Sequence, residues 1–222
     1  MSTKCGKILW IDGVEGVGKS TLIDNLICKL KKQQPNLEVV VFKFPNDNII
    51  PVRNFLLSRK NHTEDIFAYI ANILATIEAE ILPAVERGAL VVCDRSILSS
   101  FVLQLDSSVS DISNILHILD RSDTIWKRAC ELSFYVVLSD NVSTIFERIH
   151  LRENNNIRDN LTFKEIEDQI NNFHTVSYLM TTQVKWIMFI KGNGANAIRT
   201  ILHDVVPKQK IWRRILDGIS RM

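Results

Sequence analysis

The sequence predicts an α/β protein in which a five-stranded, mainly parallel sheet lies between two layers of helices. Two observations predict this class. Short apolar runs alternate with longer segments of helical spacing along the 222 residues, the pattern of strand–helix–strand units. The first such unit also contains a glycine-rich turn, at residues 13–20. Because helical crossovers cover both faces of a parallel sheet, a three-layer α/β/α arrangement follows.

The first unit spans residues 7–30 and contains the most informative motif. Residues 7–12 are typical of a short buried strand, and apolar residues at helical spacing follow residue 20. Between them, residues 13–20 (GVEGVGKS) match the pattern G-x-x-x-x-G-K-[ST] in full. In such a loop glycines let backbone N–H groups approach a phosphate, Lys19 adds charge and the Ser20 hydroxyl ligates Mg²⁺. A glycine-rich turn without a ligand is the alternative, which the complete pattern disfavours.

A second pair of candidate residues follows the third apolar run. Residues 37–44 predict a buried strand that ends in the loop Pro45-Asn46-Asp47-Asn48, and residues 89–93 predict another that ends in Asp94 and Arg95. Ligands collect at the carboxyl edge of parallel sheets, beside the phosphate loop. An acid there suits Mg²⁺ and an arginine suits a phosphate, whereas the simpler alternative is an ion pair capping the strand.

The other elements complete the alternation of strands and helices. Helices are expected over residues 51–58, 64–87, 96–104, 109–125, 141–152, 163–180 and 195–203, and strands over residues 132–138 and 185–190. Pro83 interrupts the second of these helices and Gly88 ends it.

Two polar or amphipathic segments lie outside this core pattern. Residues 153–160 (ENNNIRDN) form either a solvated loop or a mobile lid, about 152–160, that brings Arg152 and Arg158 over the phosphates. Residues 207–222 form a basic amphipathic tail, which we expect to pack on its own domain or on a sister subunit rather than on a membrane. Residues 1–206 are then a single domain.

Composition narrows the partners and the compartment. With 27 basic and 25 acidic residues the net charge is +2, so charge indicates no nucleic-acid partner. No run of 18 apolar residues occurs, and residues 1–7 contain no apolar signal-like stretch. Four cysteines without a C-x-x-C pair are typical of buried free thiols. We expect a cytoplasmic protein without a membrane partner.

Several segments together resemble the thymidylate kinase family, nucleoside monophosphate kinases of the P-loop NTPase fold. The matching pieces are IDGVEGVGKST, FPND from Phe44, YIAN from Tyr69, ILPAVERGALVVCDRSILSS from Ile81, and ERIHLREN, with Val176-Ser177-Tyr178 late in the next helix. Their order agrees over about residues 7–205. The resemblance implies transfer of a phosphoryl group from ATP to a deoxynucleoside monophosphate, dTMP, with small-molecule nucleotides as partners and a homodimer as the assembly.

The resemblance also implies the residues of the donor site. ATP would be bound by the loop and the start of its helix, at Gly13, Glu15, Gly16, Val17, Gly18, Lys19, Ser20 and Thr21, with Mg²⁺ near Ser20 and Asp94. No arginine occurs in residues 14–17, so charge neutralisation would fall on Arg148, Arg152 and Arg158, as in lids of the bacterial type. The catalytic set implied is Lys19, Arg95, Arg152 and Arg158.

For the acceptor, the resemblance implies contacts to phosphate, sugar and base. Arg95 would hold the α-phosphate and Glu15 the sugar 3′-hydroxyl. The base would lie among the remaining acceptor residues, which are Phe44, Pro45, Tyr69, Ser99, Ser100 and Gln104, with Tyr69 stacking on it.

Two positions depart from the family pattern. The base-reading arginine is replaced by Ile73, and a tyrosine that crowds the sugar's 2′ side is replaced by Leu103. Strict thymine or deoxyribose preference is therefore expected to be weaker than in the family. Two other functions remain open: a deoxynucleoside kinase, suggested by Asp94-Arg95-Ser96, and a nucleotide-binding regulatory protein without transfer activity.

Overall fold

The computed structural model describes residues 6–46, 65–104, 109–122, 124–151, 161–192, 198–199 and 201–202. Within them, five strands form one sheet in the order β2-β3-β1-β4-β5, and every pairing is parallel. The strands are β1 (Lys7–Gly13), β2 (Val39–Lys43), β3 (Leu90–Asp94), β4 (Ser133–Ser139) and β5 (Ile187–Lys191). The predicted α/β class and five-stranded parallel sheet are confirmed.

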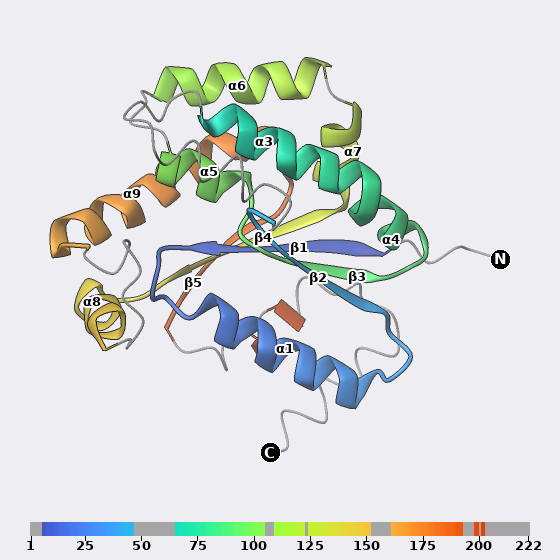
Figure 1. Cartoon of the computed structure of the whole chain (residues 1–222), viewed down its shortest axis with the longest axis horizontal. Helices are drawn as coiled ribbons and strands as arrows, with labels where there is room; N and C mark the ends of the chain where they lie inside the picture. Colours follow the sequence, from blue (N-terminus) through green and yellow to red (C-terminus); the bar gives the residue numbers. More distant parts are fainter. Residues whose placement is uncertain are drawn as a thin grey trace.

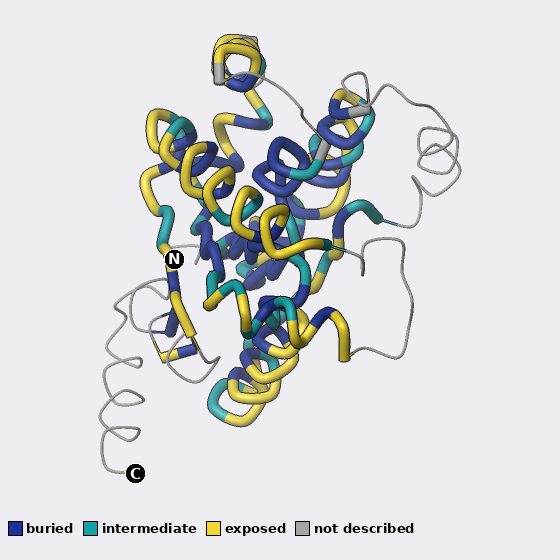
Figure 2. The backbone as a smooth tube through the Cα atoms, turned by 90° about the vertical axis from the view of Figure 1, so that its left-hand side faces the viewer, coloured by how far each residue is buried: buried dark blue, intermediate teal, exposed yellow. Residues whose placement is uncertain are grey.

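Helices cover both faces of this sheet, as Figure 1 shows with α1 below it and α3, α5, α6 and α7 above it. The helices are α1 (Lys19–Gln33), α3 (Asp65–Thr76), α4 (Leu82–Glu86), α5 (Ile97–Gln104), α6 (Val109–Ser122), α7 (Thr124–Leu132), α8 (Val142–His150) and α9 (Phe163–Met180). The core lies between these layers, where Figure 2 shows the sheet and the inward sides of the helices as buried.

Burial separates the central strands from the edge strands. β3 is buried at every position, whereas β2 alternates between half-buried and exposed residues, with Val41 46% exposed. A strand does form within residues 37–44, but the expectation that it is buried is wrong. The reason is topological: β3 is inserted between β2 and β1, which leaves β2 at the edge. An apolar run does not reveal this order.

The helical segment after residue 64 is long, apolar and packed into the core. A π-helical turn, η2 (Ile77–Ile81), precedes Pro83 and connects α3 to α4, since a proline removes a backbone donor and crowds the preceding turn. Ile66–Glu86 is the one described helix whose length and composition would suit a membrane. Its buried side chains recur at helical spacing and join the core, at Ile66, Ile70, Ile73, Ile77 and Ile81.

The region between α5 and β4 differs from its expected form. The sequence predicts one helix over residues 109–125, but the structure has α6 and α7, so that helical structure continues to Leu132 and the strand begins at Ser133. The signal was present, because Trp126, Ala129 and Cys130 are buried on one face of α7 at spacings of three and four.

The cysteines agree only in part with the expectation of buried thiols. Cys93 and Cys130 are buried, and burial raises the pKa of the Cys130 thiol to about 12. Cys28 is exposed on α1, so this part of the expectation is wrong.

The long helix α9 agrees with its predicted bounds, residues 163–180. Its first turn carries a capping box in which the Thr162 hydroxyl accepts a bond from the Glu165 backbone N–H. The Glu165 carboxylate in turn accepts a bond from the Thr162 N–H at 2.7 Å. The segments at 47–58, 153–160 and 207–222 lie outside the described residues, as does Arg152.

Candidate active site

The candidate site lies at the carboxyl edge of the central strands. β1 and β3 run parallel with Ile11 opposite Asp94, so the loops that follow them leave the sheet side by side. The Arg95 N–H donates to the Ile11 carbonyl at 2.9 Å, and Arg95 has a positive φ of 75° that turns the chain sharply there. Asp94 and Arg95 are thereby held beside the glycine-rich loop, as predicted.

The glycine-rich loop needs glycine for two distinct reasons. At Gly16 the backbone has φ 77°, and an added Cβ would lie 2.7 Å from Cγ1 of Ile149 on α8. At Gly18 φ is 100° with no atom within 4 Å of that Cβ, so only the backbone conformation demands glycine. Gly18 is the N-cap of α1 and provides no side-chain cap. The first N–H groups of α1 are thus left for an anion.

Lys19 lies inside the loop rather than in solvent. Its Nζ donates to the carbonyl oxygens of Gly13 and Val14, each at 2.9 Å. Burial, with a smaller contribution from the nearby Arg95 guanidinium, lowers the pKa of Lys19 to about 7, against the opposing pull of Glu15 and other carboxylates. A bound polyphosphate would supply the negative charge that restores the ammonium form.

Oxygen ligands suited to Mg²⁺ converge beside the loop. The Ser20 hydroxyl faces Oδ2 of Asp94 at 3.5 Å, and Oδ1 of Asp94 is buried without a partner among the described residues. A buried carboxylate oxygen with no donor fits a cation. The described residues contain no group of three or more metal-ligating side chains.

The structure pairs the two residues to which the resemblance assigns the acceptor's phosphate and sugar. Nη2 of Arg95 lies 2.5 Å from Oε2 of Glu15, with both side chains largely shielded from solvent. The Nη1 atom of Arg95 is buried and has no partner among the described residues. One face of the guanidinium is therefore held by the loop, and the other remains available for an anion.

Asp12 is a functional residue that the sequence interpretation missed. It is fully buried and accepts three hydrogen bonds: from the Ser96 N–H at 3.1 Å, the Ser96 hydroxyl at 2.6 Å and the Ser99 hydroxyl at 2.6 Å. Burial raises its pKa, while these bonds oppose the rise. These bonds fasten the start of α5 to β1. A charged residue near the end of an otherwise apolar strand was the available signal.

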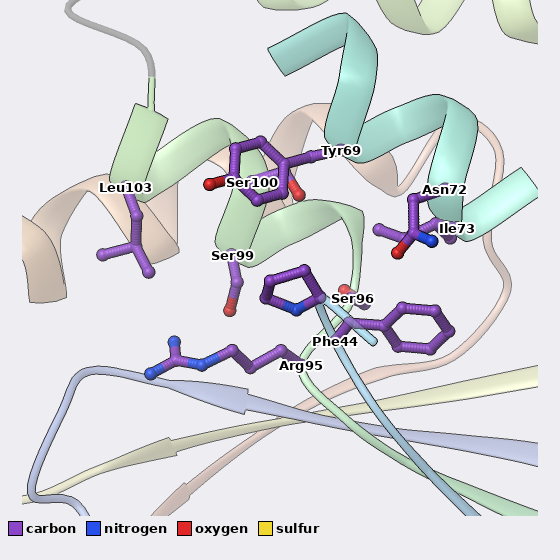
Figure 3. A pocket seen from close by; sticks show the side chains of 10 residues that line it. Phe44, Tyr69, Asn72, Ile73, Arg95, Ser96, Ser99, Ser100 and Leu103 are labelled. Atoms are coloured by element: carbon purple, nitrogen blue, oxygen red, sulfur yellow. The ribbon is translucent and has the colours of Figure 1, made fainter. Parts of the chain in front are cut away.

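A slot beside Arg95 brings together most of the residues expected to hold the acceptor (Figure 3). Its volume is about 30 Å³. It is lined by residues from β2 and its loop, α3 and α5, namely Phe44, Pro45, Tyr69, Asn72, Ile73, Arg95, Ser96, Ser99, Ser100 and Leu103. The Phe44 ring also packs against Trp10, with centroids 5.9 Å apart, so it forms part of the core. Asn72 and Ser96 were not among the expected residues.

A wider cavity of about 200 Å³ adjoins the slot. It shares Arg95 and Leu103 with the slot and adds Glu15, Leu161 and Gln169, so α9 contributes to the same region. Gln104 ends α5 near these residues, but its side chain lies outside the described part of the structure. The slot and this cavity therefore adjoin, and they meet at Arg95.

The outer side of the loop faces a third cavity, of about 820 Å³. Gly16, Gly18 and Thr21 line it together with Arg148 of α8. Arg148 also pairs with Asp140, at 3.1 Å. The structure thus brings Arg148 to the loop. Arg158, like Arg152, lies outside the described residues, so their roles stay predictions.

Comparisons with known proteins agree with this geometry. A sequence model of the thymidylate kinase family matches residues 11–198. The thymidylate kinase of Exiguobacterium sp. is 34% identical over 105 residues, 45% of this chain and 49% of that protein. That alignment spans about half the length of the relative. The thymidylate kinase of Caldicellulosiruptor saccharolyticus is 24% identical over 214 residues, 92% of this chain and 99% of that protein.

A solved structure supports the same fold. The crystal structure of thymidylate kinase from Ehrlichia chaffeensis superimposes with a TM-score of 0.60 at 17% sequence identity. The superposition covers 90% of this chain and 97% of that one. At this identity the likeness concerns the fold, including the parallel sheet and the helices that flank it.

Proposed function

The chain belongs to the thymidylate kinase family, and we propose that it transfers a phosphoryl group from ATP to dTMP, which yields ADP and dTDP. One observation carries the proposal: a triphosphate-binding loop and an arginine with a free, buried face meet at the edge of two adjoining cavities. Phosphoryl transfer requires this juxtaposition, because catalysis consists mainly of positioning two phosphates and stabilising charge.

The donor side of the reaction follows from the loop. The N–H groups at the start of α1 and the Lys19 ammonium hold the ATP phosphates. To do so, Lys19 gives up its hydrogen bonds to the carbonyls of Gly13 and Val14 and donates to phosphate oxygens instead. Ser20 and Asp94 would hold Mg²⁺, which would neutralise charge on the phosphates. Arg148, which lies on the outer cavity, and Arg152 and Arg158 supply further positive charge at the transferred group.

The acceptor side is centred on Arg95. Its free Nη1 face binds the acceptor phosphate, so that an acceptor oxygen is directed at the donor's terminal phosphate. The Glu15 carboxylate keeps the guanidinium in place. It also accepts a hydrogen bond from the sugar hydroxyl. The base lies against the slot residues, under Tyr69 and beside Ser99 and Ser100, and the slot of about 30 Å³ widens to admit it.

An acceptor panel tests this function. ADP formation from ATP and Mg²⁺ is measured with dTMP, the other nucleoside and deoxynucleoside monophosphates, and unphosphorylated thymidine. We expect dTMP-dependent ADP formation. Thymidine as the better acceptor would assign the chain to the nucleoside kinases, and ATP binding without any turnover would indicate a regulatory role.

Arg95 gives the corresponding site test. Arg95→Ala is expected to raise the KM for dTMP by about 100-fold, since a charge-assisted contact to the acceptor phosphate is lost, with little change in the KM for ATP. Arg128→Ala is the matched control, because Arg128 is exposed and forms a surface ion pair with Glu86, away from the loop and the slot. An unchanged KM for dTMP in Arg95→Ala would contradict the assigned role.

We further propose that residues 1–206 act as one cytoplasmic domain and assemble as a homodimer. The family resemblance supports the assembly, and Phe67 on α3 exposes 58% of its surface, an apolar side chain suited to a subunit interface. Light scattering on the purified protein should give twice the monomer mass of 25.4 kDa. A monomeric mass at micromolar concentration would overturn the assembly proposal.

A further inference from the structure

The position from which the family reads the base holds an apolar residue in this chain, and the polar residue next to it is Asn72. Ile73 is 2% exposed and offers no hydrogen bond to a base. Asn72 lines the same slot, and its Oδ1 atom is buried with no hydrogen-bond partner among the described residues. An unpaired buried amide oxygen costs free energy unless a donor reaches it.

A chain of three hydrogen bonds fixes the orientation of the Asn72 amide. The Thr76 hydroxyl donates its only proton to the Asn72 backbone carbonyl at 2.8 Å. With that proton committed, the Thr76 hydroxyl oxygen can only accept a hydrogen bond from Asn46. The Asn46 group 2.9 Å from it is therefore the donor, Nδ2. The Oδ1 of Asn46 then faces Asn72 and accepts from its Nδ2 at 2.8 Å.

This chain leaves the Asn72 oxygen as the atom turned to the slot. A reversed amide would place two acceptors, or two donors, against each other at one of these contacts. Figure 3 draws the Asn72 oxygen on the side of Tyr69 and Ser99 and its nitrogen on the side of Ile73. The slot therefore presents a fixed hydrogen-bond acceptor at this point.

Two of the three serines that line the slot, Ser96 and Ser99, have their hydroxyl protons engaged elsewhere. The Ser99 hydroxyl donates to Oδ1 of Asp12 and the Ser96 hydroxyl donates to Oδ2, each at 2.6 Å. Carboxylate oxygens of an ionised acid only accept, so these protons are committed. The Ser96 oxygen already accepts from the Leu98 N–H at 3.0 Å. The Ser99 oxygen can still accept, so at Ser99 as at Asn72 the slot favours a ligand that carries an N–H.

We propose that Asn72 is the specificity-determining residue for the base, and that its Oδ1 accepts a hydrogen bond from the N3–H of thymine. This inference rests on the proposed function, because thymine in a nucleotide has one N–H, at N3. Asn46 and Thr76 are positioning residues that hold the Asn72 amide in the reading orientation.

The test compares dTMP with its N3-methyl derivative, which lacks this proton but keeps both carbonyls. In the unaltered protein methylation should lower kcat/KM by at least about 10-fold, the effect of leaving a buried acceptor unpaired. In Asn72→Ala, kcat/KM for dTMP should fall, and methylation should have little further effect. Asn114→Ala, the same change on the exposed face of α6, is the control and should behave as the unaltered protein.

The positioning residues give a second, independent variant. Thr76→Val removes the hydroxyl that orients Asn46 and should reduce the discrimination against N3-methyl-dTMP, whereas Thr76→Ser keeps the hydroxyl and should restore it. Equal discrimination in the unaltered protein, Asn72→Ala and Thr76→Val would overturn the inference while dTMP turnover still stood. Absence of turnover with every acceptor in the unaltered protein would instead overturn the proposed function.

Discussion

At the scale of single residues, the site contains a lysine whose charge depends on what the loop binds. Lys19 is enclosed by the carbonyls of Gly13 and Val14, and burial lowers its pKa to about 7. Phosphates favour the ammonium form. In the loop without nucleotide Lys19 is mostly neutral above pH 7, and in the complex it is charged. Nucleotide binding above pH 7 therefore requires the uptake of a proton.

We predict that MgATP binding takes up close to one proton at about pH 8.5 and almost none from Lys19 at about pH 6. Isothermal titration in buffers with different ionisation enthalpies measures the number directly. The dissociation constant should rise by up to about 10-fold per pH unit above pH 7, as each unit makes the charged form of Lys19 rarer. Proton uptake that is the same at both pH values would contradict the assigned state of Lys19.

The buried carboxylate of Asp12 gives a second prediction at this scale. Asp12→Asn replaces one accepting oxygen by an amide donor that faces Ser96 or Ser99, both of which already donate. We expect the free energy of unfolding to fall by about 1–3 kcal/mol, measured by urea denaturation, and the KM for dTMP to rise because α5 is no longer fastened to β1. Asp24→Asn, on the exposed face of α1, should change the free energy of unfolding by less than about 0.5 kcal/mol.

Single residues also show what could be predicted of the site. Lys19, Ser20, Asp94 and Arg95 follow from local patterns, since each stands at a fixed offset from a strand or a glycine, and the structure brings them to one edge. Asp12 and Asn72 act through partners more than twenty residues away in sequence. No local spacing encodes those partners, so these two roles required the fold.

At the scale of elements, the phosphate loop is shaped by helix α8 as well as by its own glycines. A methyl group added at each glycine separates the effect of α8 from that of the backbone conformation. At Gly16 the methyl group would clash with Ile149 of α8, whereas at Gly18 no atom lies within 4 Å of it. Both positions have positive φ, which disfavours any other residue. Packing against a neighbouring helix is thus an additional constraint on Gly16 alone.

We predict that Gly16→Ala destabilises the protein more than Gly18→Ala does. Gly18→Ala should cost about 1–2 kcal/mol for the left-handed backbone, and Gly16→Ala about 1–3 kcal/mol more, because α8 must move or Ile149 must leave its rotamer. Urea denaturation of the two variants measures the difference. Equal losses of unfolding free energy would mean that α8 does not press on the loop.

The elements that were predicted well are those whose pattern is local. α9 was predicted within its observed bounds because helical spacing continues through the whole segment, and the structure adds a capping box at its start. The exposure of β2 and the division between α6 and α7 were not predicted. The exposure of β2 depends on strand order, and the division between α6 and α7 depends on packing beside the sheet. The hydrophobicity of a single segment indicates neither feature.

At the scale of the whole molecule, the parallel sheet explains why residues distant in sequence form one site. β3 is inserted beside β1, which puts the loop after Gly13 and the turn after Asp94 at the same edge, while α3, α5 and α9 border the cavities above them. Alternation of strands and helices predicted this class. The strand order β2-β3-β1-β4-β5 and the contribution of α9 to the acceptor cavity emerged only from the three-dimensional arrangement.

This arrangement brings the terminal phosphoryl group of ATP to the phosphate of dTMP, so that the group is transferred from one to the other. Phosphorus NMR of the protein incubated with ATP, Mg²⁺ and dTMP follows both products directly and in one sample. We expect equal amounts of ADP and dTDP, with no inorganic phosphate beyond the background. Appearance of ADP with inorganic phosphate, while dTMP stays unchanged, would contradict it.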